Sequence, residues 1–335
     1  MTIKDLAAIT GYSVGTVSRV LNDQPHVSPA AREAILTAAR EQGFQLNANA
    51  KQLKQQRGTS ILVICKSSGN ELFDNLLVAI QSRIARTRYP LIVDYIDESE
   101  NEVLRAIQLC AEKKPLGILF LGGQTRNFRR DFGRITMPSV LVTTSAGELS
   151  FPNLSSVCVN DNDAAQLVID ELIALGHRRF VVVGGDRVNS DIARIRYEGC
   201  LEAFHRGGIE FDSEQDYESA RFTYLGGYRA AQALLSRGRR FTALFAMSDV
   251  MAIGAIRALK DAGIRVPEDV SVMGLDGLPI GEYTTPRLST VAQPVDSLAE
   301  TSLRLLRQSM EAGSAQRHEI LPVTMLLRES TRRVQ

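Results

Sequence analysis

Residues 12–22 read YSVGTVSRVLN and contain neither proline nor a long apolar run. Ser13 is of the residue type that caps helix N-termini, so a helix is expected from Val14 to about Asn22. At about 100° per residue, Val17, Val20 and Leu21 fall on one side of this helix and predict its buried face. Its opposite side carries Gly15, Ser18 and Arg19, with Val14 near the border.

A similar helix is predicted on each side of this stretch. Residues 2–5 read TIKD, a capping-box pattern with Asp in the Glu position, and they open a helix that Gly11 ends. Ser28 and Pro29 open a third helix, which stops at Gly43. Three short helices with a tight turn between the first two predict a helix-turn-helix, whose second helix enters the DNA major groove. Periodicity alone also fits an ordinary three-helix bundle.

The sequence of residues 12–22 closely resembles that of the recognition helix of the lactose-repressor (LacI/GalR) family. The residues that match the headpiece of that family further along, at its spacing, are Val27, Ser28, Arg32, Ile35, Gly43 and Phe44. The resemblance implies sequence-specific DNA binding by this part of the chain.

Carried over by position, the resemblance assigns base reading to Val14, Gly15 and Arg19. An arginine can make the bidentate contact with guanine that is the commonest specific interaction in the major groove. Gly15 departs from the polar residue often found there and has no side chain with which to read a base. The expected phosphate contacts are Thr16, Ser18 and Asn22.

Residues 45–58 form a segment that is polar apart from Leu46, Leu53 and the alanines. It is typical of a linker, since an isolated helix of two turns is marginal in water. The segment also resembles the hinge helix of the family, which folds on the operator beside its twin in a dimer. That resemblance implies that Leu53 is an apolar wedge in the minor groove, and that Lys51 and Lys54 contact phosphates.

From residue 60 onward, short apolar strands alternate with amphipathic helices, which predicts parallel sheets covered on both faces. The strands predicted from apolar runs are 61–65, 91–95, 117–121, 140–143, 157–159, 180–184, 243–247 and 270–274. So many strand–helix units are too many for a single sheet, so two lobes, each with its own sheet, are expected. The runs 194–199, 248–254, 266–276 and 286–291 resemble the periplasmic-binding-protein-like core of the same family.

The expected fold class is therefore α/β, with an all-α headpiece and hinge helix before a two-lobed sensor. The expected domains are 1–46 (headpiece), 47–59 (hinge helix and linker) and 60–335 (effector binding and dimerisation). In the family the chain crosses between lobes three times, and the crossings are expected near 159–161, 290–292 and 320–322. The first lobe would span about 60–159 and 292–320, and the second about 160–290 and 321–330.

Ligands of open α/β sheets bind beyond the carboxyl ends of the strands, so two facing lobes predict a cleft that closes around a small molecule. The positions that the resemblance places in this cleft are Phe73, Arg196, Phe222, Ser248 and Asp276. Arg196 and Asp276 could bracket hydroxyls or a carboxylate, and the phenyl rings could stack on a ring face. Each of these residues could instead have a structural role, in core packing or in a salt bridge between the lobes.

Two departures make the predicted cleft less polar than that of many sugar-binding relatives. Thr143 stands where Asp or Asn is usual, and Ile192 replaces a hydroxyl residue. A modified or phosphorylated sugar or a nucleoside therefore stays open beside a plain hexose.

Enzymatic function is not expected. Residues 182–186 read VVGGD after a strand but lack the GxGxxG pattern of nicotinamide-binding folds. The four histidines are dispersed, and the four cysteines form neither a CxxC pair nor a cluster with histidine, so no catalytic residue, metal site or cofactor is predicted. Isolated cysteines in apolar runs and the lack of a signal peptide or membrane span indicate a cytoplasmic protein.

The function expected from the sequence is that of a transcriptional regulator, most simply a repressor. Its partners would be a near-palindromic operator, a second copy of the chain and a sugar-like effector. The alternative is a solute-binding protein of a transport system, which shares the sensor fold. The headpiece and the missing signal peptide argue against that alternative.

Overall fold

A computed structural model describes residues 3–21, 27–42, 58–66, 70–312 and 316–334. The chain divides into two compact units, residues 1–57 and 58–335. The predicted hinge residues Lys51, Leu53 and Lys54 lie outside the described residues, as does Asn22.

The first unit contains the three predicted helices, α1 (Ile3–Thr10), α2 (Val14–Leu21) and α3 (Pro29–Glu41). Gly11 takes a φ of +72° in the turn after α1, and the Ser13 hydroxyl then accepts a hydrogen bond from the Thr16 N–H at 3.1 Å. The Ser28 hydroxyl caps α3 in the same manner. The helices enclose one small core, made of Leu6, Ala7, Val17, Val20, Ile35 and Ala39.

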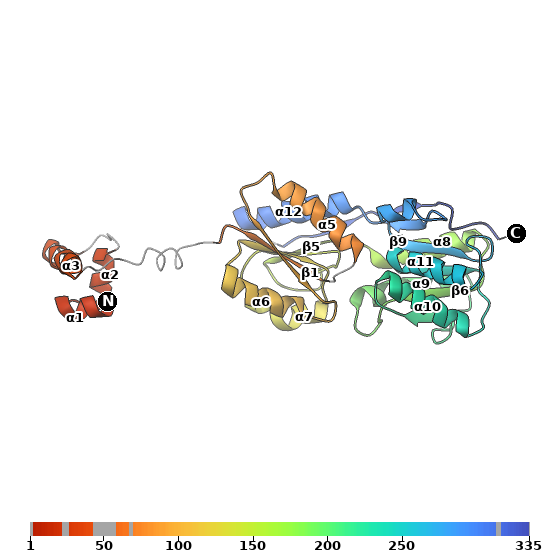
Figure 1. The fold of residues 1–335 in the computed structure, drawn as a ribbon, viewed down its shortest axis with the longest axis horizontal. Coiled ribbons are helices and arrows are strands. Elements are labelled where there is room, and N and C mark those ends of the chain that lie inside the picture. Colours follow the sequence, from red (N-terminus) through yellow and green to blue (C-terminus); the bar gives the residue numbers. More distant parts are fainter. Residues whose placement is uncertain (1–2, 22–26, 43–57, 67–69, 313–315, 335) are drawn as a thin grey trace. The chain divides into compact units, whose positions relative to one another are not determined.

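The second unit holds two six-stranded sheets, and each defines a lobe (Figure 1). The first sheet has the order β11-β5-β4-β3-β1-β2 and is parallel throughout. Its strands are β1 (Ile61–Lys66), β2 (Leu91–Ile96), β3 (Gly117–Leu121), β4 (Ser139–Val142), β5 (Leu154–Val159) and β11 (His318–Leu321). Four of these strands, β1, β3, β4 and β5, are buried along their whole length, which explains their near-continuous apolar sequences.

Helices cover both faces of the first sheet. Those on one face are α5 (Glu71–Ile84) and α12 (Val295–Ala312), and those on the other are α6 (Glu102–Lys113) and α7 (Thr125–Asp131). A 3-10 turn, η1 (Phe132–Arg134), follows α7. Leu76 of α5 and Leu298 of α12 pack with Val63, whereas Val103 of α6 packs with Leu62 on the opposite face. Alternate residues of β1 thus enter different cores, as the period of two in a strand requires.

The second sheet has the order β12-β10-β9-β8-β6-β7, with β12 antiparallel to β10 and the other pairs parallel. Its strands are β6 (Phe180–Gly184), β7 (Tyr217–Ser219), β8 (Ala243–Ala246), β9 (Ser271–Asp276), β10 (Ser289–Ala292) and β12 (Thr324–Leu326). One face is covered by α8 (Asp161–Ala174) and α9 (Asp191–Arg206), and the other by α10 (Tyr224–Ser236) and α11 (Asp249–Asp261). A 3-10 turn, η2 (Pro279–Glu282), follows β9.

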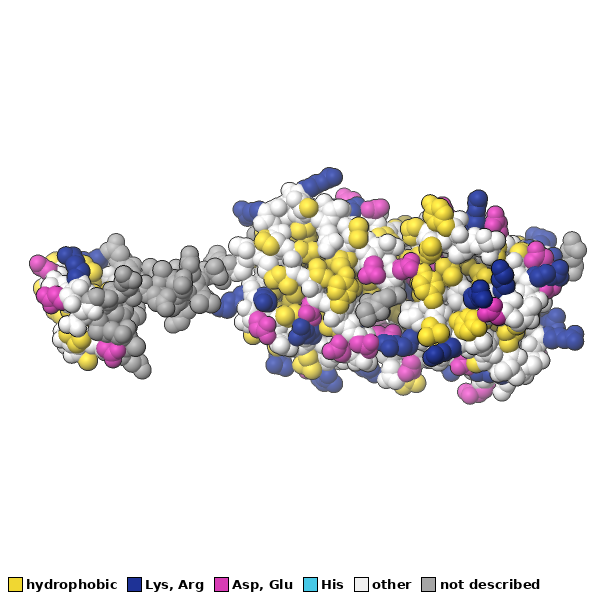
Figure 2. All heavy atoms as spheres, viewed as in Figure 1, with side chains coloured by type: hydrophobic (Ala, Val, Ile, Leu, Met, Phe, Trp, Pro, Cys, Tyr) yellow, Lys and Arg dark blue, Asp and Glu magenta, His cyan; other side chains and the backbone are white. Residues whose placement is uncertain are grey.

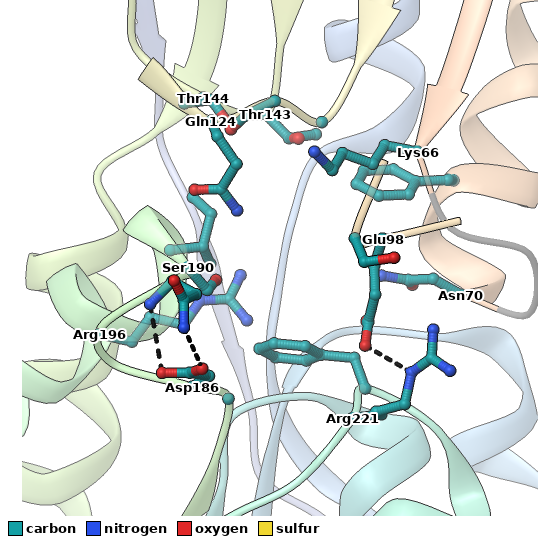
Figure 3. Close-up of a pocket in the computed structure, with 18 of the residues that line it drawn as sticks. Lys66, Asn70, Glu98, Gln124, Thr143, Thr144, Asp186, Ser190, Arg196 and Arg221 are labelled. Atoms are coloured by element: carbon teal, nitrogen blue, oxygen red, sulfur yellow. Dashed lines mark hydrogen bonds and ion pairs between the residues drawn. The ribbon is translucent and has the colours of Figure 1, made fainter. Parts of the chain in front are cut away.

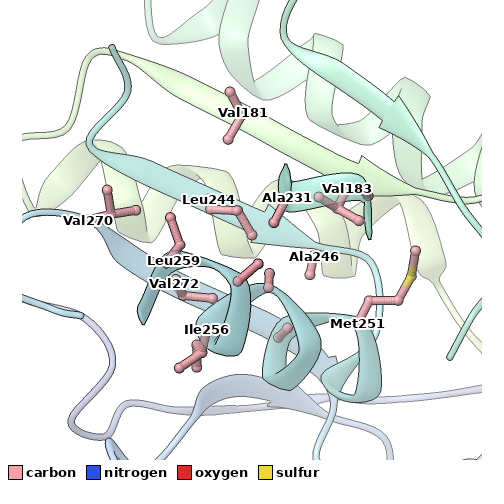
Figure 4. Packing of buried hydrophobic residues seen from close by; sticks show 14 of the residues in the cluster. Val181, Val183, Ala231, Leu244, Ala246, Met251, Ile256, Leu259, Val270 and Val272 are labelled. Atoms are coloured by element: carbon pink, nitrogen blue, oxygen red, sulfur yellow. The ribbon is translucent and has the colours of Figure 1, made fainter. Parts of the chain in front are cut away.

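Figure 4 shows the core beneath α11. Val181 and Leu244 point from neighbouring strands toward Leu259, and Ala231 of α10 joins the same cluster. Small side chains predominate where the two helices approach each other: a Cβ on Gly254 of α11 would lie 2.0 Å from the carbonyl oxygen of Tyr224. This close approach fixes α10 and α11, and with them the loops that begin both helices.

The α/β class and the parallel sheets confirm the fold expected from the sequence. The sequence does not predict four short strands, β7, β10, β11 and β12, because polar residues interrupt each of them and leave no recognisable apolar run. The chain passes from one sheet to the other at residue 160, at 293–294 and at 322–323. The second passage comes slightly later than the predicted 290–292, because β10 remains paired with β9 as far as Ala292.

Candidate functional site

The carboxyl ends of both sheets border one cavity of about 810 Å³ in the second unit. The first lobe contributes Lys66 from β1 and residues that follow β3 and β4, among them Gln124 and Thr143. From the second lobe come residues that follow β6 and β7, together with Asp276 at the end of β9. This is the position at which open α/β sheets bind ligands.

Two phenyl rings enter the cavity, one from each lobe, and both lie against glycine backbone. A Cβ on Gly122 would be 2.9 Å from the Phe73 ring, and a Cβ on Gly185 would be 2.6 Å from the Phe222 ring. A side chain at either glycine would force the neighbouring ring out of its position. The two glycines therefore set the width available to a ligand.

The floor of the second lobe is a buried charged cluster centred on Arg196. Its Nε donates to Oδ1 of Asp161 at 2.8 Å, its Nη1 donates to the carbonyl oxygen of Met247, and its Nη2 lies 3.6 Å from Oδ1 of Asp276. All three charged side chains are almost wholly buried. Because burial of an unpaired charge is costly, this geometry keeps the guanidinium fixed.

Asp276 is the member of this cluster that faces a second polar residue. Gln293 Nε2 donates to Oδ1 of Asp276 at 2.9 Å, while Gln293 Oε1 is buried without a hydrogen-bond partner. Burial raises the pKa of Asp276 to about 7; Arg196 opposes this rise and the nearby carboxylate of Asp249 adds to it. A buried acceptor and a carboxyl group that can hold a proton are suited to ligand hydroxyl or N–H groups.

A second buried ion pair lies on the first-lobe side of the cavity. Lys66 Nζ is 2.5 Å from Oε2 of Glu102 and donates to the carbonyl oxygen of Glu100 at 2.8 Å. Glu102 also accepts from the backbone N–H of Gln124 at 2.6 Å and from Asn127 Nδ2 at 3.0 Å. Glu102 therefore ties the ends of β1 and β3 to the start of α7, which fixes this wall.

Four of the five residues predicted for the cleft line the cavity: Phe73, Arg196, Phe222 and Asp276. Ser248 is not among the lining residues. Its buried hydroxyl accepts from the Met251 N–H and caps α11, so it turns toward its own helix. Thr143 and Ile192, the two departures from the family pattern, both line the cavity.

Sequence reasoning missed Lys66, Gln124, Arg221 and Gln293, which also line the cavity (Figure 3 labels the first three). For two of them a usable signal existed, because Lys66 ends β1 and Gln124 comes soon after β3. Arg221 and Gln293 follow β7 and β10, which the sequence does not predict. The positions of strand ends, however, do not predict which residues of one lobe face which residues of the other.

Backbone strain is concentrated at the cavity. Among the described residues, positive φ angles of non-glycine residues occur at Lys114, Thr143 (+71°) and Asp276 (+129°), and the last two line the cavity from opposite lobes. Such conformations persist only where the surrounding structure enforces them, and they cluster at ligand sites.

The exposed face of α2 in the first unit contains the residues predicted to read bases. Val14 is 46% exposed, Gly15 and Arg19 are also exposed, and Val17 and Val20 are buried beneath them. Thr16 and Ser18 are half-buried. The helix therefore presents a short, mostly polar surface that can enter a groove.

Within the described parts of the chain, no group of three or more His, Cys, Asp or Glu side chains could hold a metal ion. The same described ranges contain no helix long and apolar enough to cross a membrane. Cys65, Cys158 and Cys200 are buried free thiols, and burial raises the pKa of Cys65 and of Cys158 to about 12. Such thiols are inert nucleophiles.

A helix-turn-helix unit joined to a two-lobed α/β unit with a central cavity defines a class of ligand-responsive DNA-binding proteins. Comparisons with known families agree with this class. Residues 2–47 match the model of bacterial regulatory proteins of the lacI family, and residues 169–331 match that of periplasmic binding protein-like domains.

Similar proteins span the whole chain. The HTH-type transcriptional regulator MalR of Clostridium butyricum is 32% identical, over 98% of this chain and 99% of its own length. The HTH-type transcriptional repressor CytR of Escherichia coli K12 is 30% identical, over 99% of this chain and 96% of its own length. The chain therefore belongs to the LacI family; it is a DNA-binding transcriptional regulator and not an enzyme.

Solved structures of relatives share the whole fold. The lac repressor dimer bound to operator and the anti-inducer ONPF has a TM-score of 0.74 at 25% identity, covering 99% of both chains. The complex of the transcriptional regulator CelR with cellobiose has a TM-score of 0.69 at 27% identity, covering 98% of this chain and 99% of that one.

Proposed function

We propose that this chain is a repressor that binds a near-palindromic operator as a homodimer, and that a sugar-like molecule in the cleft between the lobes switches its operator affinity. The observation that carries the proposal is the presence in one chain of an exposed, mostly polar helix face on α2 and a cavity of about 810 Å³ at the carboxyl ends of two sheets. The first element fits the major groove, and the second fits a small molecule.

In this proposal, Val14, Gly15 and Arg19 meet base edges, and Thr16 and Ser18 meet phosphates. Their support is the exposed or half-exposed position of all five residues on α2, above a separate buried core. Phosphate contacts by Asn22, Lys51 and Lys54 and the minor-groove wedge Leu53 rest on the family resemblance alone, since these residues lie outside the described ranges.

The proposed effector contacts are Phe73, Arg196, Phe222 and Asp276. A sugar ring offers one apolar face for an aromatic ring and several hydroxyls for charged partners. Gln293 Oε1, buried and without a partner, adds an acceptor beside Asp276. The cellobiose held by CelR and the ribose operon repressor of Haemophilus influenzae, 29% identical to this chain, support a carbohydrate class.

A homodimer is supported by apolar side chains on the surface of both lobes. In the first lobe, Val78 of α5 is 63% exposed and Tyr95 of the edge strand β2 is 51% exposed; in the second lobe, Tyr283 is 81% exposed. Figure 2 shows hydrophobic side chains on the visible face of both lobes. We propose that these side chains are covered by a second copy of the chain.

The test is thermal unfolding of the full chain with a panel of sugars, sugar phosphates and nucleosides, followed by operator binding with any stabilising compound. A ligand at 100 times its Kd should stabilise the folded state by about 2.7 kcal/mol. Coupling requires that the same compound change operator affinity, and that operator change effector affinity by the same factor. A stabilising compound without effect on DNA binding would contradict the proposed switch.

A further inference from the structure

The start of α7 in the first lobe and the start of α9 in the second lobe cap each other. Asp191, the first residue of α9, accepts hydrogen bonds at Oδ2 from the backbone N–H of Thr125 at 2.7 Å and from its hydroxyl at 2.8 Å. In return, Oε1 of Gln124 accepts from the backbone N–H of Asp191 at 3.1 Å. Arg126 adds a hydrogen bond to Asn189 at 3.1 Å.

For α7, this arrangement replaces a cap that the helix would otherwise need from its own residues. The helix α9 has its own cap, because the Ser190 hydroxyl accepts from the Ala193 N–H at 3.3 Å, and Gln124 adds an acceptor for the Asp191 N–H. The first N–H groups of a helix have no partner inside the helix, and a carboxylate there also interacts favourably with the helix dipole. Gln124 makes no side-chain capping bond within α7, so the carboxylate comes from the other lobe. Separating the lobes would return both N–H groups to water.

A second set of contacts joins the lobes elsewhere around the cavity. Arg221, in the loop before α10, donates from Nη2 to Asp97 at 2.6 Å and from Nε to Glu98 at 2.5 Å. Tyr224 also donates a hydrogen bond to Glu71 at the start of α5. Asp97 and Glu98 follow β2, so these contacts bind a first-lobe loop to a second-lobe loop.

The two sets of contacts lie on opposite sides of the cavity. Figure 3 shows Gln124 on one side and the Glu98–Arg221 pair on the other, with the cavity between them. All three residues line the cavity. A ligand that enters between the lobes must therefore pass groups that hold the lobes together.

We propose that these contacts form two latches, the Asp191 latch and the Arg221 latch, which hold the lobes closed by protein groups alone and limit how fast an effector enters and leaves. The inference rests on the proposed function of the cleft, of which it describes the regulation. The latches act together, since neither rim of the cleft can open widely while the other holds. Weakening one latch should consequently loosen the other.

Hydrogen–deuterium exchange of the full chain, freed of small molecules by unfolding, dialysis and refolding, tests this coupling without an effector. The variants are Asp191→Ala and Arg221→Ala. The matched controls are Asp163→Ala, which also removes an acid from the first turn of a second-lobe helix, and Arg239→Ala, which removes an arginine that pairs with Asp212 and Asp216 inside the second lobe.

In the wild type, the Thr125 and Asp191 amides should exchange more slowly than solvated loop amides. Asp191→Ala should speed exchange at Thr125 by about tenfold or more, the scale of a hydrogen bond to a charged group. Arg221→Ala should speed exchange at both amides by about two- to fivefold, the scale of an exposed ion pair. Because Arg221 contacts neither amide, a merely local role would leave them unchanged, as Arg239→Ala should.

Two results would overturn the proposal: Thr125 and Asp191 amides that exchange freely in the wild type, or an Arg221→Ala effect confined to residues 97–98 and 221. Neither result depends on an effector or on DNA, so a failure of the latches is distinguishable from a failure of the proposed regulatory function. With an effector in hand, Arg221→Ala should raise the rates of association and dissociation together, and unchanged rates would count against the latch.

Discussion

Arg196 Nε donates to Oδ1 of Asp161 at 2.8 Å, and both side chains are almost wholly buried in the second lobe. Asp161 begins α8, directly after the first passage between lobes, whereas Arg196 lies on α9 and lines the cavity. The ion pair therefore connects the hinge side of the lobe to the proposed effector site. The same guanidinium also faces Asp276, so one positive charge stands against two carboxyl groups in this cluster.

Removing Asp161 should destabilise the protein strongly. Asp161→Ala leaves Arg196 buried without its nearest partner, and breaking a buried pair in this way typically costs about 3–5 kcal/mol. Asp163→Ala, two residues along the same helix, removes an exposed acid and should cost about 1 kcal/mol or less. Urea unfolding of both variants checks this, and equal losses of stability would contradict the role of the buried pair.

Asp276 should make stability depend on pH. Since burial raises its pKa to about 7, the folded state keeps a proton that the unfolded state releases near pH 4. The folded state therefore binds more protons between about pH 4 and 7, and this group's contribution to stability falls as pH rises through that window.

Asp276→Asn should reduce the loss of unfolding free energy between pH 5 and pH 8 by about 2–3 kcal/mol, because the extra proton is held over about two pH units of this range and one pKa unit corresponds to about 1.4 kcal/mol. Urea titrations of wild type and variant at several pH values measure the difference. Parallel pH profiles would show that Asp276 is ionised throughout this range.

Arg19 should determine base preference at one position of each half-site. Arg19→Ala is expected to cost about 1–3 kcal/mol of operator binding and to relax selection at that base pair. Arg40→Ala, an exposed arginine near the end of α3, is the matched control. Selection from randomised duplexes measures the preference, and a uniform loss of affinity for all sequences would reassign Arg19 as a phosphate contact.

The core of the first unit should be sensitive to small losses of volume. Ile35 is fully buried in a small cluster of six buried apolar side chains, of which it is one, and Ile35→Ala should cost about 2–5 kcal/mol. We expect DNA binding to disappear while the main thermal transition, that of residues 58–335, stays unchanged. Calorimetry and gel shift assays measure the two effects, and a shift of the main transition would contradict the separation into two units.

Much of the fold follows from local sequence. The capping residues Ser13 and Ser28 begin the expected helices, and the eight strands with continuous apolar runs lie where those runs predict. The missed strands β7, β11 and β12 are at the ends of their sheets, where a strand has one neighbour and needs few apolar residues. Ser248 was assigned to the cleft by position, but a hydroxyl at a helix start is equally suited to capping.

The sequence by itself determined the α/β class, the headpiece, the family and four of the cavity residues, because helix caps, apolar periods and family motifs are encoded over short distances. Only the tertiary structure decided that Asp191 caps a helix of the other lobe and that Arg221 pairs with Asp97 and Glu98. These partners lie 66, 124 and 123 residues apart in the chain, and no local pattern specifies contacts across such separations. The cap and the ion pairs form only when the two folded lobes pack against each other, and this packing determines the shape of the cleft and the position of its latches.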